Sequence, residues 1–599
     1  MKKSFFRRHT YKLLISAFIL CVGIAAAKIV RQEREAFAMS KDLPRGAIVY
    51  AQFSDLPGLI KRWDESKLKS KYVESENFER FQNRHLTLKL LKRWEEFNDA
   101  LGFSLDANAL IGSSENKTAI ALYDIGGLDI VFIAPISSDK IAETIFHKNK
   151  DKFEERSLAD DTTYYSLSFE ADRGRKQQKV LFTAVKGRFV LATNESLFLR
   201  TVANINGKTK KDSLADEPSF FELSKIVTPH DATVWVDQKK LNKDLYFKHY
   251  WLMSNASDLK NIRAGMFDLE IKEDKWIERR EFLSVKNESY KTISQSEINK
   301  MKEILPKDAP LLKMKTVDNE HEAELLIRKT LFDTLKDNKN QTERKSWDSF
   351  TDFDYARSDY RYHYDYLDYY SSIDSRFDEK IDDLEETENE IELKKEFLQE
   401  VIQKAEPVYS VFVAKPQPMK EPFFAEFNRS LFLKLRKPNA FSSKEFEDSI
   451  STIVENKLLV SGAKANLKWA DGKENDLNWR ELSLPMLGWK LCYRFENTEL
   501  IIANNTNTMM EILALQRNRM EPKAKDKSFF QSVTVIRFDK RDSTYNQIVQ
   551  PLEKNTDSFF LNDIGSLLDV IADVKTVEIK KKATLKGFHE EVEISLEKK

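Results

Sequence analysis

An internal repeat is the feature of this sequence that most limits what the chain can fold into. Residues 180–203, VLFTAVKGRFVLATNESLFLRTVA, align without a gap with residues 491–514, LCYRFENTELIIANNTNTMMEILA. Each segment begins with alternating apolar residues, turns at Lys186-Gly187 or Asn497-Thr498, and continues with a second apolar run. In both segments a polar residue then precedes another apolar stretch, which is typical of a helix start. The pattern predicts a β-hairpin followed by a helix in each segment.

Shorter segments recur in the same order along the chain, which indicates that a whole domain is duplicated. The pairs are 43–47 with 305–309, 137–145 with 442–450, 219–224 with 528–533, 233–237 with 535–539, and 265–283 with 578–596. A chain of 599 residues is also longer than one ordinary core accommodates. We therefore expect a first repeat at 41–290 and a second repeat at 300–599.

The expected fold class is α+β, because strands in hairpins alternate with helical segments along both repeats. The arrangement that we predict is two tandem copies of a mostly antiparallel sheet domain, with helices packed on one face, after one N-terminal transmembrane helix. The elements expected in the first repeat are a strand at 43–53, a helix capped by Asp55, a helix over 85–100, a hairpin closed near Gly126-Gly127, a helix from Ser138, and strands near 265–271 and 276–283.

The first thirty residues have the pattern of a membrane segment. Residues 1–12 are basic, and residues 13–27 carry no charge. Fifteen helical residues cover roughly 22 Å, and extension to Val30 brings the helix close to the roughly 30 Å hydrocarbon core. Two interpretations compete: an uncleaved anchor over 13–30, and a signal peptide with Ala25-Ala26-Ala27 as its cleavage site. The anchor is favoured because basic residues follow directly.

Both interpretations carry the remainder of the chain across the membrane. With the anchor, residues 1–12 form a cytoplasmic tail, residues 13–30 cross the inner membrane once, and the bulk of the chain is periplasmic. The membrane is then a partner through the N-terminal helix. Lysine plus arginine equals aspartate plus glutamate, 97 of each, and this balance argues against nucleic acid as a partner.

A tyrosine- and aspartate-rich stretch, YARSDYRYHYDYLDYY at 355–370, lies in a predicted insertion near 345–380 of the second repeat. Tyrosine offers large amphipathic contact area, so one interpretation is a binding surface. The alternative is a surface insertion without a partner, kept soluble by its acidic residues. The candidate binding residues are Tyr355, Tyr360, Tyr362, Tyr364, Tyr366, Tyr369 and Tyr370. An acidic helix with apolar residues from Phe377 to Ile402 follows and is expected to end before Pro407.

Motifs for catalysis, cofactors and metals are absent from the sequence. No two histidines share a metal-ligand spacing, and HEAEL at 321–325 has Leu325 where a zinc helix needs a second histidine. There is no phosphate-binding glycine loop and no nucleophile elbow. We therefore predict no catalytic residue, no metal and no cofactor.

Three single residues have two interpretations each. Cys492 falls in a predicted strand, which favours a small packed side chain over a reactive thiol. Asp237 and Asp539 end matching strands in the two repeats. They are either ligand contacts or, as we prefer, turn formers and helix caps.

The segments LPRGAIVYAQFSDLPGLI (43–60), LGFSLDANALIG (101–112) and SLADEPSF (213–220) resemble a bacterial family known as a domain of unknown function. Its members are membrane-anchored or secreted. The resemblance is better over residues 43–283 than in the second repeat, which lacks the LAD part of the motif. It implies an extracytoplasmic α+β protein and brings no activity or site residues with it.

These observations favour a non-enzymatic binding or scaffold protein of the bacterial envelope, with a protein, glycan or lipid partner. One alternative is an envelope hydrolase that uses scattered carboxylates, which leave no local signature. Another is a carrier of an apolar ligand. A cleft with converging ionisable groups would favour the hydrolase, whereas an apolar cavity would favour the carrier.

Overall fold

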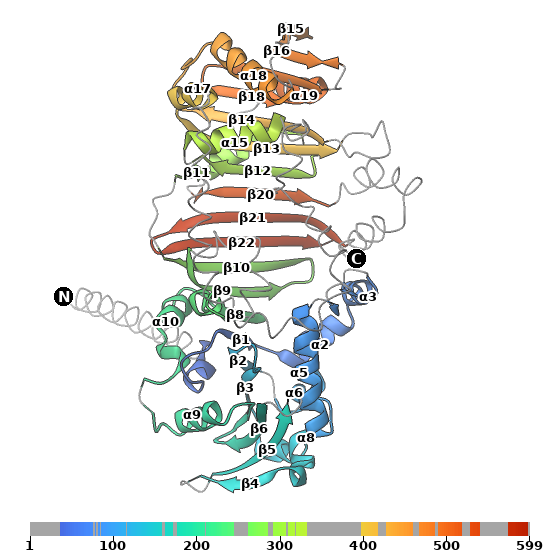
Figure 1. Cartoon of the computed structure of the whole chain (residues 1–599), viewed down its shortest axis with the longest axis vertical. Coiled ribbons are helices and arrows are strands. Elements are labelled where there is room, and N and C mark those ends of the chain that lie inside the picture. Colours follow the sequence, from blue (N-terminus) through green and yellow to red (C-terminus); the bar gives the residue numbers. More distant parts are fainter. Residues whose placement is uncertain are drawn as a thin grey trace, which may run out of the picture. The chain divides into compact units, whose positions relative to one another are not determined.

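The computed structural model describes residues 36–75, 78–79, 82–83, 85–114, 117–158, 162–171, 176–209, 211–244, 261–285, 291–306, 309–317, 319–331, 397–416, 427–458, 467–485, 489–517, 528–538 and 573–596. These residues form two compact units. Unit 1 takes its described residues from 1–295 and 526–599 together with Pro416, and unit 2 takes them from 296–415 and 427–525. Both units combine helices with antiparallel strands, so the expected α+β class is confirmed (Figure 1).

Unit 1 contains one antiparallel sheet. Its strands pair in the order β4 (Glu154–Ser157), β5 (Thr163–Ala171), β6 (Lys176–Val185), β7 (Arg188–Ala192), β3 (Asp129–Pro135), β2 (Thr118–Asp124), β1 (Val49–Phe53), β8 (Ala232–Val236), β9 (Ile262–Ile271), β10 (Lys275–Ser284), β22 (Gly587–Leu596), β21 (Val574–Thr584) and β20 (Ser532–Arg537). A short second pairing joins β11 (Ile293–Ser294) to β19 (Phe529–Phe530).

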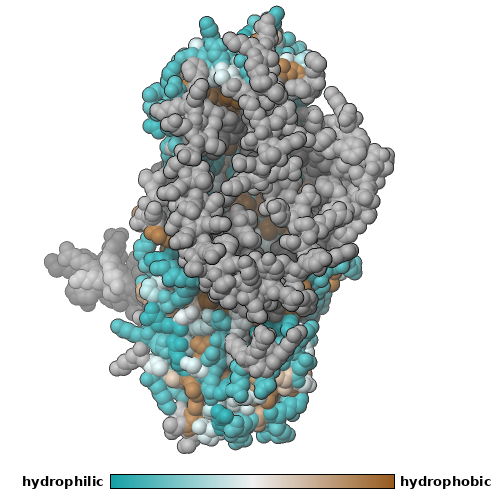
Figure 2. Space-filling model, viewed as in Figure 1, coloured by the Kyte–Doolittle hydropathy of each residue, from teal (hydrophilic) through white to brown (hydrophobic). Residues whose placement is uncertain are grey.

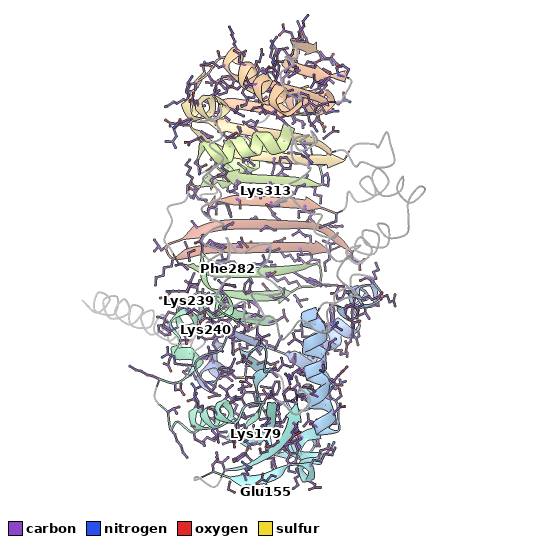
Figure 3. All side chains as sticks on the ribbon, in the orientation of Figure 1. Glu155, Lys179, Lys239, Lys240, Phe282 and Lys313 are labelled. Atoms are coloured by element: carbon purple, nitrogen blue, oxygen red, sulfur yellow. The ribbon has the colours of Figure 1, made fainter. Side chains whose placement is uncertain are left out.

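The last strands of the chain therefore complete the sheet of unit 1, although the sequence assigns them to the repeat at 300–599. The link is the antiparallel pair β10–β22, in which Glu281 lies opposite His589 and Phe282 lies opposite Phe588. The rings of Phe282 and Phe588 stack with their centroids 4.4 Å apart. Figure 1 shows β22 and β21 beside β10, and Figure 3 marks Phe282 on β10.

Helices cover both faces of the sheet around β7, so the expectation of helices on one face is wrong for unit 1. The helices and short 3-10 turns of this unit are η1 (Ala38–Lys41), α2 (Leu56–Asp64), α3 (Lys67–Val73), α5 (His85–Leu101), α6 (Ala107–Ile111), α7 (Ser138–Ile141), α8 (Ile145–Lys148), η2 (Lys150–Lys152), α9 (Glu195–Ile205), η3 (Leu214–Asp216), α10 (Pro218–Ser224) and α11 (Gln238–Leu241). Phe189 and Leu191 of β7 belong to one core with α5 and α8, while Val190 and Ala192 belong to another with α9 and α10. A strand that reads as a continuous apolar run is buried on both sides.

Unit 2 has two groups of paired strands. One is β12 (Leu311–Thr316) with β13 (Pro407–Pro416), and the other runs in the order β14 (Phe427–Leu435), β18 (Glu499–Ala503), β17 (Trp489–Glu496), β16 (Leu477–Leu484) and β15 (Trp469–Glu474). Its helices are α14 (Gln295–Ile304), α15 (Glu320–Leu331), α17 (Phe397–Ala405), α18 (Ser443–Leu458) and α19 (Thr506–Arg517). Residues from β14, β16, β17 and β18 form one core with α15, α17 and α18.

The hairpin and helix predicted from the repeat are confirmed in both units. Strands β6 and β7 turn at Lys186, and strands β17 and β18 turn at Asn497, each with a positive φ, of 49° and 54° respectively. Leu181 pairs with Ala192 in unit 1, and the aligned Cys492 pairs with Ala503 in unit 2.

The helices that follow the two hairpins also agree residue by residue with the alignment. The side chain of Asn194 accepts a hydrogen bond from the backbone N–H of Leu197 at 3.2 Å, and the side chain of Asn505 accepts one from Thr508 at 3.2 Å. The four buried positions of α9 align with the four buried positions of α19: Leu197, Phe198, Thr201 and Val202 with Thr508, Met509, Ile512 and Leu513.

Several other local predictions are confirmed. Asp55 caps α2 by accepting from the backbone N–H of Gly58 at 3.1 Å. Helix α5 covers the range predicted near 85–100, the hairpin β2–β3 encloses the two glycines, and β9 and β10 cover the predicted final strands. Helix α17 ends at Ala405, before Pro407.

Two local predictions differ from the structure. The strand expected at 43–53 begins only at Val49, because Gly46 has a φ of 108° and the chain before it runs as bends and a single bridge. The aligned segments 219–224 and 528–533 are a helix in α10 and strand residues in β19 and β20, respectively, so their likeness in sequence does not carry a common structure.

Three predicted regions lie outside the described residues: the segment 1–35, the insertion near 345–380, and the acidic helix predicted from Phe377 as far as residue 396. Among the helices that the structure does describe, none is both long and apolar enough to cross a membrane.

Candidate functional site

An apolar cavity of about 130 Å³ lies in unit 1, between helices α5 and α6 and the sheet. Its walls come from α5, α6, the loop that joins them, the turn that precedes β3, and strands β2, β3 and β7. The lining residues are Trp94, Phe97, Leu105, Leu110, Ile120, Leu128, Ile130, Phe132, Leu191, Ala192 and Thr193.

Local sequence signals hold the two helices over the sheet. Phe97, on the apolar stripe of α5, is 1% exposed. The side chain of Asn98 accepts from the backbone N–H of Leu105 at 2.8 Å, which fastens the loop after α5. Asp106 then caps α6 by accepting from the N–H of Ala109 at 3.0 Å. These contacts fix the helical wall of the cavity against the strands.

Thr193 carries the one hydroxyl in the lining, and that hydroxyl is already satisfied. The hydroxyl of Thr193 donates to the carbonyl oxygen of Leu128 at 2.6 Å and accepts from the N–H of Ile130 at 2.8 Å. None of the lining residues carries an ionisable group. A cavity of this size with apolar walls excludes water and accepts small apolar molecules. The cavity can therefore hold an apolar group but supplies no acid, base or nucleophile.

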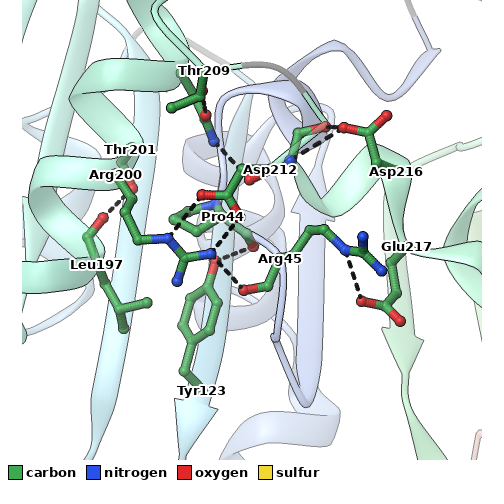
Figure 4. A network of polar contacts seen from close by, with 12 residues as sticks. Pro44, Arg45, Tyr123, Leu197, Arg200, Thr201, Thr209, Asp212, Asp216 and Glu217 are labelled. Carbon is green, nitrogen blue, oxygen red and sulfur yellow. Dashed lines mark hydrogen bonds and ion pairs between the residues drawn. The ribbon is translucent and has the colours of Figure 1, made fainter.

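The SLADEPSF motif lies elsewhere in unit 1, in the polar network of Figure 4. Arg200 of α9 makes two hydrogen bonds to Asp212, of 2.9 and 2.6 Å. The backbone N–H of Arg45 donates to the carbonyl oxygen of Asp212 at 3.2 Å, and the hydroxyl of Tyr123 donates to the carbonyl oxygen of Pro44 at 2.9 Å. Asp212, the residue before the motif, thus fastens the segment before β1 to α9, and Tyr123 fastens the same segment to β2.

Protonation states in this network follow from its contacts. The hydrogen bond from Arg200 lowers the pKa of Asp212. The same bond raises the pKa of Arg200. Burial raises the pKa of Tyr123. All three groups therefore keep their ordinary neutral-pH charge, which suits a structural clamp rather than proton transfer.

The rest of the motif anchors α10. Ser213 and Asp216 form a capping box at η3, and Leu214 is fully buried. The ring of Phe220 packs edge-on against Phe37 at 5.6 Å, and also against Tyr50 and Trp235. Sequence reasoning singled out the motif without assigning it a role. The structure gives it one in packing.

A second polar cluster surrounds the buried carboxylate of Asp268 on β9, whose side chain is 1% exposed. It accepts from the backbone N–H of His230 at 2.7 Å and from the hydroxyl of Thr233 at 3.0 Å, and it lies 2.5 Å from Nδ1 of His230. Arg279 approaches the same carboxylate at 3.7 Å.

This cluster has the orienting carboxylate of a catalytic dyad but no nucleophile among its described contacts. The hydroxyl of Ser54 donates to the carbonyl oxygen of His230, not to its ring. Arg279 and Lys272 lower the pKa of the neighbouring Glu270 to about 2 through their hydrogen bonds. The charges are engaged with one another, which is typical of a structural ion-pair network. Spacing along the sequence gave no signal for it.

The single residues named from the sequence have clear outcomes where the structure describes them. Asp237 caps α11 by accepting from the N–H of Lys240 at 2.9 Å, as the preferred interpretation predicts. Cys492 is fully buried in β17, and burial raises the pKa of its thiol to about 11. His321 lies in α15, and no group of three metal-ligating side chains gathers among the described residues.

Other candidates fall outside the part of the chain that the structure describes. They are Asp539 and the seven tyrosines Tyr355, Tyr360, Tyr362, Tyr364, Tyr366, Tyr369 and Tyr370.

Comparison with known proteins gives little. No family model and no curated protein matches the chain. Among solved structures, the match to crystal form III of TP0453 covers 45% of this chain and 87% of the TP0453 chain. The two sequences are 11% identical, and the TM-score is 0.23. Crystal form I of TP0453 covers 42% and 79% at 10% identity, also with a TM-score of 0.23. A likeness this distant carries no argument about function.

Proposed function

We propose that the chain is a membrane-anchored, extracytoplasmic and non-enzymatic binding protein built from two copies of one α+β fold. Its binding site is the apolar cavity of the first copy. The observation that carries this proposal is the lining of the cavity, which has apolar walls and no ionisable side chain.

Tandem duplication is supported by strand pairings that recur in chain order. The pairs β3–β7, β7–β6, β6–β5 and β5–β4 correspond to β14–β18, β18–β17, β17–β16 and β16–β15. The series β8–β9–β10 corresponds likewise to β20–β21–β22.

One side-chain contact recurs as well. The Ile130 N–H donates to Thr193 Oγ1 at 2.8 Å in the first copy. The Arg429 N–H donates to Asn504 Oδ1 at 2.8 Å in the second. Thr193 and Asn504 occupy aligned positions, so the two copies fasten the same pair of strands in the same way.

The envelope location rests on the sequence alone. The uncharged residues 13–27 and the basic tail before them support an inner-membrane anchor with the folded part outside the cytoplasm. The resemblance to a membrane-anchored or secreted family of unknown function agrees with this location, and we propose membership of that family on the same grounds.

The ligand class follows from the size of the cavity. A volume of about 130 Å³ suits one small apolar group, such as a benzene-sized ring or the end of an alkyl chain. Lipid and aromatic partners offer such groups. A glycan does not, because its hydroxyls would lose their hydrogen bonds in apolar walls.

Thermal unfolding with and without benzene tests the site. Benzene at ten times its Kd should stabilise the chain by about 1.4 kcal/mol. Phenol, similar in size, should stabilise it less because its hydroxyl finds no free partner. The variant Ile120→Phe narrows the cavity and should reduce the benzene shift. Equal benzene shifts in the two proteins would exclude this cavity as the binding site.

A further inference from the structure

Four large apolar side chains of unit 1 are exposed near one end of its strands. Phe221 of α10 is 50% exposed, Ile226 and Val285 are 59% exposed, and Leu585 is 94% exposed. Much of the described surface of unit 1 in Figure 2 is hydrophilic, with apolar residues scattered over it. A cluster of exposed apolar side chains at one place therefore indicates a surface that binds a partner.

Contacts among the backbone and side chains bring these four residues together. Neighbouring antiparallel strands place the start of one beside the end of the next. The starts of β9 and β22 therefore lie beside the ends of β10 and β21. The N–H of Ser284 donates to the carbonyl oxygen of Lys586 at 2.8 Å. Glu222 of α10 then pairs with Arg263 of β9 at 2.7 Å and with Lys586 at 3.3 Å. We name Phe221, Lys225, Ile226, Val285, Leu585 and Lys586 the α10 edge.

The α10 edge carries two cations, Lys225 and Lys586, among its apolar groups, and Glu222 is the acidic side chain that pairs with Lys586. The ammonium of Lys225 lies 3.7 Å from the ring centroid of Phe221, and the side chain of Lys586 is 64% exposed. Figure 3 shows Lys239 and Lys240 close to α10, and Lys240 pairs with Glu217, the residue before that helix, at 3.5 Å. Apolar groups interleaved with cations are the composition that binds an anionic lipid surface.

The start of the described chain lies beside the same helix. Phe37 packs on Phe220 of α10, and the carbonyl oxygen of Ala36 accepts from the side chain of Gln52 at 2.9 Å. Only residues 31–35 separate Ala36 from the end of the apolar segment at Val30. Five residues reach at most about 18 Å even when fully extended. A membrane-spanning 13–30 segment would thus keep α10 close to the bilayer.

We propose that the α10 edge rests on the anionic surface of the bilayer that holds residues 13–30, with Phe221, Ile226 and Leu585 inserted among the headgroups. This inference rests on the proposed anchor. Unit 1 then contacts the membrane at two points, the anchor at 13–30 and the α10 edge. Two contacts fix the orientation of unit 1 on the membrane as well as its distance from it.

Spin labels on the full chain in nanodiscs test the contact. The background is Cys21→Ser, since Cys492 is buried and inaccessible to the reagent. Labels go on Ile226→Cys and Leu585→Cys, with Asp151→Cys in η2 as a control. In nanodiscs with anionic lipid we expect the first two labels to lie about 5–10 Å into the interface and to lose access to a water-soluble relaxation agent. The control should keep full access.

A variant and an extraction assay separate this inference from the anchor. Phe221→Glu combined with Leu585→Glu should restore water access at Ile226→Cys. Leu199→Glu, at an exposed position of α9, should not. Alkaline extraction of membranes reports the anchor alone. If the chain stays in the membrane but both labels remain in water, the α10 edge proposal is overturned and the anchor stands. If extraction releases the chain, both fail.

Discussion

The hairpin and helix of β6–β7–α9 and those of β17–β18–α19 have the same backbone but different chemistry in the core that they face. Phe182 on β6 packs among aromatic rings: the ring centroids of Phe146, Phe153 and Tyr165 lie 5.6, 5.0 and 5.0 Å from its own. Its aligned partner on β17 is Tyr493, whose hydroxyl donates to Glu447 at 2.8 Å.

Glu447 is itself held by two hydrogen bonds from Arg480, of 2.7 and 3.0 Å. Unit 2 thus places a polar chain of contacts where unit 1 has aromatic packing. The comparison teaches that the turn, the cap and the strand pairing define this fold. The interior chemistry can change as long as each buried polar atom has a partner.

Exchange of the two side chains should give the largest effect. Phe182→Tyr buries a hydroxyl in a core of mostly apolar rings and should cost about 1–3 kcal/mol of unfolding free energy. Tyr493→Phe removes a hydrogen bond to a carboxylate and should also cost about 1.5–3 kcal/mol. Urea denaturation measures both. A neutral Phe182→Tyr would mean that the new hydroxyl finds a partner, such as the hydroxyl of Tyr165, and would contradict the contrast between the two cores.

Removal of the helix caps should give an intermediate and matched effect. Asn194→Ala and Asn505→Ala each delete a side-chain acceptor at the same position of the repeat and should each cost about 1 kcal/mol. The measurement is the urea midpoint of each variant. Asn507→Ala, at an exposed position in the first turn of α19, serves as a control for loss of an asparagine side chain. Unequal costs for the two caps would break the correspondence between the two hairpin–helix segments.

The Arg200–Asp212 clamp beside the SLADEPSF motif should give the smallest effect, because the two side chains are each about one third exposed, at 36% and 33%. Since Arg200 lowers the pKa of Asp212, the stabilisation is present above the unfolded-state pKa and disappears as the pH falls through the folded-state value. Asp212→Asn should cost less than about 1 kcal/mol at pH 7 and nothing at low pH. A cost independent of pH would show that the geometry of the loop matters rather than charge.

Sequence reasoning predicted local structure well where the signal is local. The caps at Asp55 and Asp237 need only a short polar side chain before a helical run, and the hairpin at Lys186 needs only alternation and a turn. Sequence reasoning failed at 528–533. The two phenylalanines there match the sequence of α10 but lie in a strand, because tertiary context overrides so short a similarity.

The candidate site was not predictable from the sequence. Trp94, Leu110 and Ile130 come from three separate elements, and each one reads as an ordinary core residue. A cavity arises where packed side chains fail to fill the space between a helix and a sheet. That depends on the helix position to within the size of a methyl group. The Asp268 cluster was hidden for a similar reason, since its members meet only across paired strands.

By itself, the sequence determined the α+β class, the hairpin–helix unit that occurs twice, and the buried, unreactive setting of Cys492. These depend on periodicity, turns and caps, which act over a few residues. Only the tertiary structure decided that the final strands join β10, that helices cover both faces around β7, and that an apolar cavity remains beneath α5. These outcomes depend on pairing and packing between segments far apart in the chain, and short-range patterns carry no information about that.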